Sequence, residues 1–445
     1  MTINAFYTLC KDIFDSYESK WNNDQKELDK VNKHLKLALQ GYSEGEKYFK
    51  GQIAEYLKTF EKESDEYPKY YNNLVDAIYH ENWGYAGMAE FFEKYSDISS
   101  AKIIGNSIYF LINGELTLMP QTISNDRRAQ LYKKLLSFIP KERLDRDYHE
   151  IQLLDGIRVT IYNESMSKAD QDSLVFRRYI IPSYNLEEQE SRGTISKGMI
   201  PLFKSIVKLG FNTAITGPVR SAKTTFLATL LSYEDPTLEG VMIETSPEIP
   251  LHKIMPKAPI IQLIADGENL RNITKPLLRS DADYLIMAEA RDGIALDIAV
   301  KIANKGTRRC KMTFHNRNPL DFCEDVASEI IKTEGGNMHY VAAKVAKSVD
   351  YIYHFMQLKD KSKKRLHSIH ELSFDRESGK IQMIEICKYD ILEDKWGFRY
   401  CISKNKERDG REEDNEDFEN FARILKELAD EFPLDGDGKH VFDYN

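Results

Sequence analysis

The sequence predicts an α/β protein built around a parallel sheet, and three observations carry this prediction. Between residues 195 and 390, short apolar runs alternate with segments of helical periodicity, which is the sequence form of a parallel sheet. One of these alternations surrounds the stretch GPVRSAKTT at 217–225, which is close to the phosphate-loop pattern G-x-x-x-x-G-K-[ST]. Two further apolar runs end in glutamates, where a parallel sheet presents functional side chains.

The context of this loop supports a phosphate site. A helical segment upstream is predicted to end at Gly210, and FNTAIT at 211–216 is predicted to be a short buried strand. The stretch at 224–233 has helical periodicity, so the loop joins a strand to a helix. Backbone N–H groups and the helix N-terminus would then face an anion.

The loop residues have distinct expected roles. Lys223 is predicted to reach the terminal phosphates, and the Thr224 hydroxyl is predicted to bind magnesium. Ala222 occupies the position where the pattern has glycine, so its methyl group costs little in a helical conformation and about 1 kcal/mol at positive φ. The residues expected to contact the nucleotide are Gly217, Ser221, Ala222, Lys223, Thr224 and Thr225.

Length, cysteine spacing and net charge limit the classes of protein to which this chain can belong. The 445 residues predict two or three domains, and no apolar run approaches the length of a membrane span. The N-terminus meets acidic residues too early for a secretory signal. Five cysteines without C-x-x-C spacing predict free thiols in a reducing cytoplasm. The net charge of −9 argues against a general nucleic-acid-binding surface and leaves a local basic patch open.

Four regions are expected along the chain. Residues 1–90 form a helical N-terminal extension, 91–190 an α/β N-terminal domain, 195–400 the phosphate-loop domain, and 401–445 an acidic tail with an amphipathic helix. The default expectation for the acidic tract is a solvated tail.

Within the second region, two hairpins and a linker are predicted. The hairpins span 106–119, around Asn113 and Gly114, and 150–163, around Asp155 and Gly156. The polar segment 185–194 is a candidate linker or hinge.

Carboxylates at strand ends extend the loop into a candidate site. One apolar run ends in Glu244, with Glu248 four residues later, and another ends in Glu289. A carboxylate there can hold magnesium through water or activate an attacking water. A third run, CKMTF, is followed by His315. Each of these strand-end residues alone is weak evidence for a catalytic site, and the set of them after a phosphate loop is much stronger evidence.

Over about residues 95–400 the chain resembles the secretion-superfamily motor ATPases of type II secretion, type IV pili and type IV secretion. It looks closest to the branch that serves Flp/Tad-type pilus assembly. The similar stretches are IETSPEI, LRNITKPLLRSDADYLIMAEAR and TFHNRNP, with LLDGIRVTI and SLVFRRY in the N-terminal half. The chain departs from the family pattern at Ala222, Thr245, Ala288 and Thr307.

The resemblance implies an N-terminal α/β domain hinged to a RecA-like ATPase domain, with ATP and Mg²⁺ as cofactors and a homo-hexameric ring as the assembly. It implies that Glu244 activates water and that Glu289 holds Mg²⁺ through water. His315, with Arg177 or Arg178, would sense charge on the γ-phosphate. The implied setting is the cytoplasmic face of the inner membrane, beside a polytopic platform protein, with no nucleic acid expected.

Two alternatives stay open. The departures from the pattern motivate a scaffold that binds nucleotide but barely hydrolyses it. A DNA-transfer ATPase of the same superfamily is a weaker alternative, which salt-sensitive DNA binding would support. Because Lys223, Thr224, Glu244 and Glu289 are all present, we favour an active ATPase with slow turnover.

Overall fold

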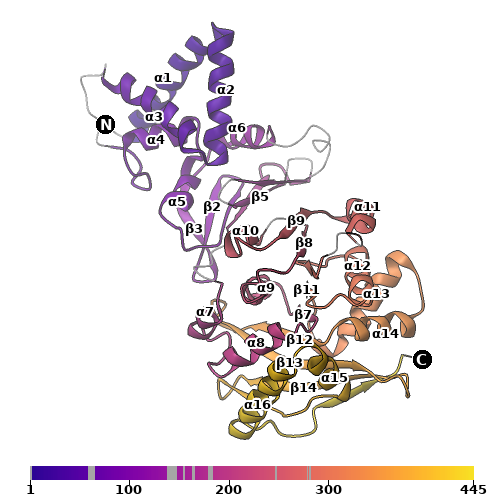
Figure 1. Ribbon diagram of the computed structural model, residues 1–445. Coiled ribbons are helices and arrows are strands. Elements are labelled where there is room, and N and C mark those ends of the chain that lie inside the picture. Colours follow the sequence, from indigo (N-terminus) through magenta and orange to yellow (C-terminus); the bar gives the residue numbers. More distant parts are fainter. Residues whose placement is uncertain are drawn as a thin grey trace. The chain divides into compact units, whose positions relative to one another are not determined.

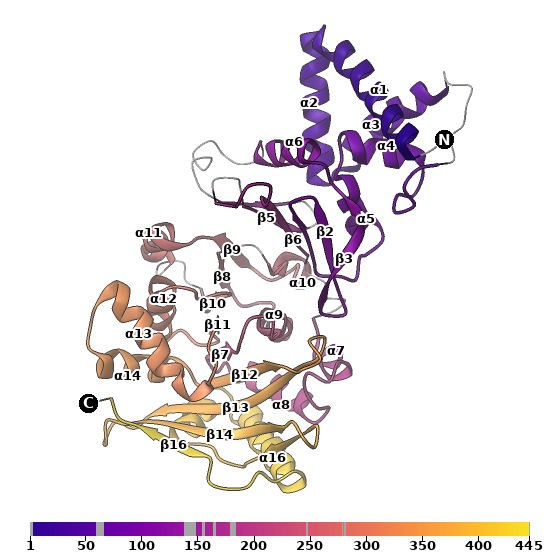
Figure 2. The same ribbon diagram turned by 180° about the vertical axis from the view of Figure 1, so that it is seen from behind.

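The computed structural model divides the chain into two compact units, Met1–Ile180 (unit 1) and Ile181–Asn445 (unit 2), each described by itself (Figures 1 and 2). The described residues are 3–58, 66–137, 148–153, 156–162, 166–178, 184–245, 248–277, 279 and 282–444. Among the helices formed by these residues, none combines the length and the apolar character that a membrane span requires.

Unit 1 begins with helices that share an aromatic core, so the helical pattern predicted for residues 1–90 is confirmed. The helices are α1 (Ile3–Asn22), α2 (Gln25–Gln40), α3 (Ser43–Lys58), α4 (Leu74–Asn82), η1 (Ala86–Met88) and α5 (Ala89–Glu93). The rings of Phe49 and Trp83 stack with their centroids 5.3 Å apart, and Trp21 packs against both. These large buried rings hold the helices together by removing apolar area from water.

The second part of unit 1 is an antiparallel sheet. Its elements are β1 (Ser100–Ile104), β2 (Ser107–Ile112), β3 (Glu115–Thr122), α6 (Asn125–Leu136), β4 (Tyr148–Gln152), β5 (Arg158–Tyr162) and β6 (Ser173–Arg177), in the strand order β3-β2-β1-β6-β5-β4. Both predicted hairpins are present, as the pairs β2–β3 and β4–β5. Asn113 and Gly114 have φ of 49° and 82°, the left-handed conformation that a tight two-residue hairpin turn requires. Asp155 lies outside the described residues.

A buried arginine joins the helices of unit 1 to its sheet. Arg127 on α6 donates through Nε to the Glu81 carbonyl (2.6 Å) and through Nη2 to the His80 carbonyl (3.1 Å). These carbonyls lie at the C-terminal end of α4, where helix carbonyls lack intrahelical partners and a cation is favoured. The helical extension and the sheet therefore form one packed unit.

Unit 2 contains the predicted parallel sheet. Its strands are β7 (Thr213–Thr216), β8 (Gly240–Glu244), β9 (Ile260–Ile264), β10 (Tyr284–Met287), β11 (Lys311–Phe314), β12 (Tyr351–Gln357), β13 (Lys364–Phe374), β14 (Ile381–Asp390), β15 (Lys395–Phe398) and β16 (Lys439–Phe442). The strand order is β15-β14-β13-β12-β7-β11-β10-β8-β9, with β16 paired to β14. The strands from β12 to β9 are parallel, and β13 to β16 extend the sheet antiparallel.

Helices cover both faces of this sheet (Figures 1 and 2). One apolar core contains α8 (Met199–Lys208), α9 (Lys223–Leu231) and α16 (Asn415–Glu431), and the other contains α11 (Gly267–Leu277), α12 (Gly293–Ala303), α13 (Phe322–Glu334) and α14 (Met338–Ser348). The remaining helices are α7 (Leu186–Ser191), α10 (Leu251–Ile254), η3 (Pro319–Asp321) and α15 (Lys404–Glu413). The α/β fold class predicted from the sequence is confirmed, since burial on both faces is what a parallel sheet requires.

The linker predicted at 185–194 is wrong. Residues 186–191 form α7, whose Leu186 is fully buried in the core of unit 2 and whose Gln189 donates to Thr229 Oγ1 (3.1 Å). The Asn185 side chain caps the helix at the N–H of Glu188. The polar composition reflects the exposed face of a short capped helix.

The solvated tail expected after residue 401 is also wrong, although the amphipathic helix itself is confirmed. In α16, Phe418, Phe421 and Leu425 are buried in the core that includes α8. At the start of α15, the N–H of Ser403 donates to the carboxylate of buried Glu371 (3.0 Å). The acidic residues mark the exposed sides of helices whose apolar sides complete the core.

Candidate functional site

The phosphate-like loop lies between β7 and α9, as the sequence predicts, and its first glycine is sterically required. Gly217 has φ of 136°, and a Cβ there would come within 2.3 Å of the Phe355 carbonyl oxygen on β12. Backbone this close to a neighbouring strand excludes any side chain. Ser221 is buried and its hydroxyl donates to the Pro218 carbonyl (2.8 Å), which closes the loop on itself.

Two other loop residues have left-handed backbone. Ala222 has φ of 77° and ψ of 20°, and Arg220 has φ of 64°. The sequence left the conformation of Ala222 open between helical and positive φ, and the structure has the second. For residues with a side chain this conformation costs roughly 1–2 kcal/mol each. The loop is therefore strained at two positions where glycine would relieve the strain.

The Lys223 side chain folds back into the loop. Its Nζ donates to the carbonyls of Gly217 (2.9 Å) and Pro218 (2.7 Å) and lies 3.1 Å from His315 Nδ1. Burial lowers the pKa of this ammonium to about 8, against the attraction of Glu289 and Glu248. Within the described part of the chain, no carboxylate lies at ion-pair distance from it. A buried cation that lacks such a partner leaves a place for an anion.

Glu289 follows β10 and is surrounded by cationic or polar donors. Its Oε2 lies 2.7 Å from Arg291 Nη2, and its Oε1 lies 3.5 Å from His315 Nε2. Burial alone would raise the pKa of this carboxyl, but the hydrogen bonds from His315 and Arg291 outweigh it and lower the pKa to about 2. Glu289 is therefore an anion throughout the physiological pH range.

Glu244 is the last residue of β8, and its pKa is shifted in the opposite direction from that of Glu289. Burial raises the pKa of its carboxyl to about 7, although its Oε1 accepts hydrogen bonds from the N–H groups of Glu248 and Ile249 (3.0 Å each). A carboxyl that titrates near neutral pH can both take and release a proton there. The next residue, Thr245, has a buried hydroxyl without a hydrogen-bond partner among the described residues.

Sheet topology explains why these residues meet. Met287 pairs with Ile243 on one side and with Met312 on the other, and Phe314 pairs with Thr216. Because β8, β10, β11 and β7 are neighbours and parallel, their carboxyl ends share one edge. Thr313 Oγ1 also donates to the Ala288 carbonyl (2.6 Å), which holds the segment leading to Glu289 against β11.

The structure separates the two arginines proposed as charge sensors. Arg178 donates to the carbonyls of Tyr95 (2.8 Å) and Phe91 (3.2 Å), and its guanidinium lies over the Phe91 ring. It has a structural role at the end of α5. Arg177 is exposed at the end of β6 and belongs, like Arg178, to unit 1, whereas the lysine and carboxylates belong to unit 2.

Of the other loop residues, Thr224 and Thr225 lie half-buried in the first turn of α9. The hydroxyl of Thr224 is available as an oxygen ligand beside Lys223, and the Thr225 carbonyl accepts a bond from Thr229. The sequence did not point to Arg220, whose backbone is left-handed in the loop, or to His354, whose ring contacts Thr216. The signal for His354 was one imidazole inside the otherwise apolar and aromatic run YIYHFM.

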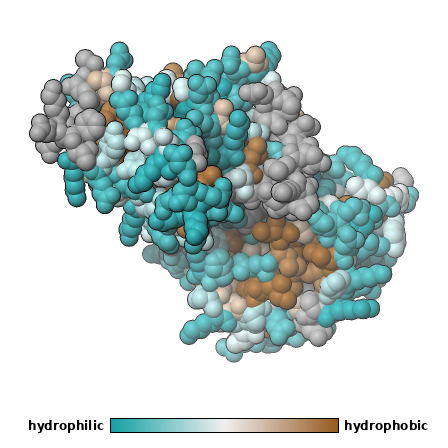
Figure 3. Space-filling model, turned by 90° about the horizontal axis from the view of Figure 1, so that it is seen from above, coloured by the Kyte–Doolittle hydropathy of each residue, from teal (hydrophilic) through white to brown (hydrophobic). Residues whose placement is uncertain are grey.

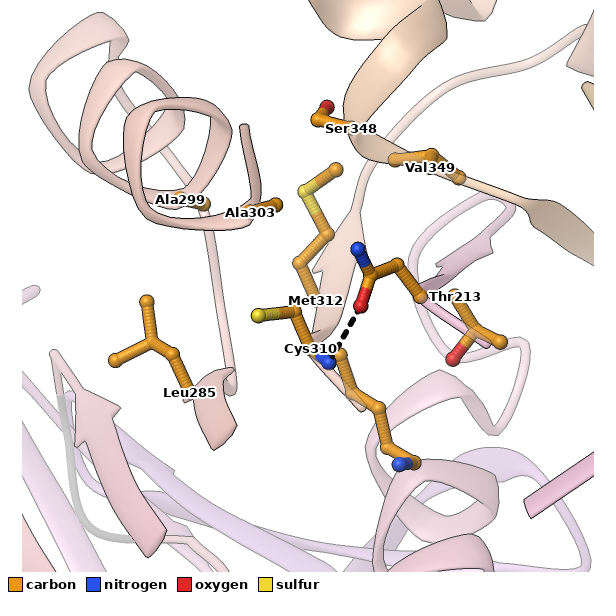
Figure 4. Close-up of a pocket in the computed structure, with 10 residues that line it drawn as sticks. Thr213, Leu285, Ala299, Ala303, Cys310, Met312, Ser348 and Val349 are labelled. Carbon is orange, nitrogen blue, oxygen red and sulfur yellow. Dashed lines mark hydrogen bonds between the residues drawn. The ribbon is translucent and has the colours of Figure 1, made fainter. Parts of the chain in front are cut away.

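A small pocket lies at the opposite, amino-terminal ends of the strands. Figure 4 shows its lining, which includes Thr213, Leu285, Ala303 and Met312, with the Asn212 side chain accepting from the Cys310 N–H (2.9 Å). Mostly apolar and away from the phosphate loop, it is not the candidate site. The five cysteines are free, as predicted, and the described residues hold no group of three or more His, Cys, Asp or Glu arranged for a metal ion.

Comparisons with known proteins give the family. The model of the family "Type II/IV secretion system protein" matches residues 156–382, just over half of the chain. No curated protein matches the chain.

Similar solved structures include the VirB11 ATPase of the Brucella suis type IV secretion system (15% identity, 64% of this chain, 95% of that chain, TM-score 0.35). They also include the pilus retraction motor PilT with bound ADP (15% identity, 61% of this chain, 78% of that chain, TM-score 0.43). A further one is the Yersinia pseudotuberculosis ATPase DotB (15% identity, 83% of this chain, 90% of that chain, TM-score 0.49). The family match covers the phosphate loop, both strand-end glutamates and His315, so the chain belongs to the type II/IV secretion system protein family.

Proposed function

We propose that this protein is a motor ATPase that hydrolyses ATP within a secretion or pilus-assembly machine. The observation that carries the proposal is the buried Lys223 ammonium, which contacts two backbone carbonyls and His315 at the carboxyl edge of the sheet. The pKa of about 8 keeps it positively charged at neutral pH. Membership of the secretion family supports the same reading.

In this proposal, each side chain has one task. Lys223 and the loop N–H groups bind the phosphates of ATP. Thr224 and Glu289 are oxygen donors that fit Mg²⁺, because a carboxyl with a pKa of about 2 is always anionic, and the ion would neutralise charge on the phosphates.

Glu244 is the proposed base that takes a proton from the attacking water, and its pKa of about 7 suits that task. His315 contacts both Lys223 and Glu289, so it is placed to respond when an anion draws Lys223 away from the loop carbonyls. Arg177 stays a candidate for charge stabilisation on the family resemblance alone.

The finer assembly is also a proposal. We infer a homo-hexamer at the cytoplasmic face of the inner membrane, driving a polytopic platform protein of the Flp/Tad type. The edge strand β9 exposes Ile261 and Ile264, at 52% and 64%, and Figure 3 shows apolar side chains gathered on one part of the surface. Exposed apolar surface of this kind is typical of protein interfaces. Light scattering with an ATP analogue should then show a species near six subunits, whereas a monomer under every condition would contradict the ring.

Two observations favour a second candidate, a scaffold that binds ATP without turning it over. The left-handed Ala222 and Arg220 strain the loop, and Glu244 Oε1 is already held by two backbone N–H groups. A measurement of phosphate release from ATP distinguishes the motor ATPase from the scaffold. We expect wild-type turnover to exceed that of Glu244→Gln by roughly 100-fold or more, because an amide cannot accept the proton of water.

Glu268→Gln is the matched control, since it makes the same change at an exposed carboxylate and should leave most turnover in place. ATP binding should survive in both variants. Wild-type protein that binds ATP but hydrolyses it no faster than Glu244→Gln, with membranes and partner proteins supplied, would establish the scaffold instead.

A further inference from the structure

His354 lies directly beside the strand that enters the phosphate loop. In the sheet, Thr216 pairs with Phe314 of β11 on one side and with His354 of β12 on the other. The residues that follow these three are Gly217, His315 and Phe355. His354 therefore lies level with Thr216 and Phe314, the last strand residues before the loop and before His315.

The His354 ring contacts both Thr216 and the segment that follows His315. Its Nδ1 lies 2.9 Å from Thr216 Oγ1, and the ring also hydrogen-bonds the backbone of Arg317, two residues after His315. Thr216 is fully buried and His354 is 4% exposed, so water does not compete for either bond. With Nδ1 directed at the Thr216 hydroxyl, the other ring nitrogen is left for Arg317, and one neutral tautomer satisfies both bonds.

The surroundings keep this ring neutral. Burial lowers the pKa of His354 to about 4, and the neighbouring His367 and Lys223 lower it further. The His367 ring on β13 packs edge-on against His354 with centroids 5.7 Å apart. The bridge between Thr216 and Arg317 therefore persists across the physiological pH range.

We propose that His354 is a positioning residue that fixes the segment carrying His315 relative to the phosphate loop, an inference that rests on the proposed ATP hydrolysis. His315 contacts Lys223 Nζ at 3.1 Å, so its position affects the group that binds phosphate. Misplacement of a catalytic group by about 1 Å costs on the order of 100-fold in rate. A buried bridge two residues from His315 is a direct means of preventing it.

The test uses the full-length protein and three variants. His354→Phe removes both hydrogen bonds, and we expect kcat to fall at least roughly tenfold while the Kd for ATP changes less than about threefold. His354→Gln places an amide near the Arg317 backbone and should recover most of the lost kcat. His370→Phe is the control, because His370 is equally buried on β13 and bonds only Ser368 among the partners described. It should lower thermal stability without changing kcat.

A second readout does not depend on hydrolysis, and its first part uses only the wild-type protein. Imidazole ¹⁵N NMR of the wild type should show His354 neutral and protonated only at Nε2 between pH 5 and 8. The His315 signals should shift in His354→Phe and stay unchanged in His370→Phe. A His354 ring that titrates near 6.5, or His315 signals and kcat unaffected in folded His354→Phe, would overturn the inference. Absent wild-type turnover would contradict the ATPase proposal alone, and the NMR result would still decide the role of His354.

Discussion

The carboxyl ends of β8 and β10 each lead to a glutamate, and the pKa values of these two side chains are shifted in opposite directions. Glu244 is the last residue of β8 and Glu289 lies two residues after β10, and the two strands pair directly through Ile243 and Met287. Yet the pKa of Glu244 rises to about 7, whereas that of Glu289 falls to about 2. Both carboxyls are buried enough for desolvation to raise the pKa, so the difference comes from their partners.

The partners differ in charge. Glu289 has Arg291 and His315 within 3.5 Å, and these groups favour the anion. Glu244 has two backbone N–H donors and no cation among the described residues at ion-pair distance, so burial prevails. Neighbouring groups whose pKa values are pushed apart are the usual basis for separate roles in one reaction. Under the proposed function, these pKa shifts fit proton transfer by Glu244 and a permanent negative charge on Glu289.

A large effect on ATP binding is expected from removing the cation that contacts the phosphate loop. Lys223→Ala should weaken ATP binding roughly 10- to 100-fold, because hydrogen bonds from a charged donor contribute about 1.5–3 kcal/mol. Fluorescence titration with a labelled ATP analogue measures this. Lys253→Ala, in the short helix α10, is a control that should bind normally. Unchanged affinity in Lys223→Ala would place the phosphate site elsewhere.

The pH dependence of kcat/KM tests whether Glu244, the glutamate with the raised pKa, acts as the base. Glu244 must be deprotonated to accept a proton, so the rate should fall about tenfold per unit as pH drops below about 7. Lys223 must be protonated to bind phosphate, so the rate should also fall above about pH 8. The profile is therefore a narrow bell. A plateau extending down to pH 5 would show that no group with a pKa near 7 acts as the base.

Glu289→Gln tests the other carboxylate. The neutral amide keeps the shape but loses the charge, so the Mg²⁺ concentration for half-maximal turnover should rise roughly tenfold. Titration of the hydrolysis rate with Mg²⁺ measures the change, with exposed Glu268→Gln as the control. If the Mg²⁺ requirement stays at the wild-type value, Glu289 has no part in holding the ion.

The smallest expected effect concerns the strained loop. Ala222→Gly should raise the free energy of unfolding by about 1 kcal/mol or less, because glycine adopts φ of 77° without a Cβ clash but loses more chain entropy on folding. The same substitution at Ala228, inside α9, should destabilise instead. Thermal unfolding compares them, and equal destabilisation by both substitutions would mean that Ala222 is not strained.

Sequence patterns predicted the parts of the fold that depend on local order. The strand before Gly217, the helix from Lys223 and the hairpin at Asn113 and Gly114 are all confirmed, because apolar periodicity and turn residues specify them locally. The segments at 185–194 and after 401 were mispredicted for one shared reason. Their polar residues are visible in the sequence, whereas the core that buries Leu186 and Phe421 forms only in three dimensions.

The candidate site shows the same limit. The sequence predicted Lys223, Glu244, Glu289 and His315 as site residues, but it could not distinguish the two glutamates, because their pKa values depend on groups brought together by strand order. It favoured Arg177 with Arg178 as the alternative, and the contacts of Arg178 with Phe91 and Tyr95 now separate the two arginines. The role of His354 depends on sheet pairing and carries no motif.

The most direct test of the central claim is a carboxyl titration of the two glutamates. Selective ¹³C labelling of glutamate side chains, with Glu244→Gln and Glu289→Gln to assign the signals, reports both pKa values without requiring activity. We predict that Glu244 titrates near pH 7 and that Glu289 remains ionised down to about pH 2. Two carboxyls that titrate together near the ordinary glutamate value of about 4.3 would contradict the division of roles.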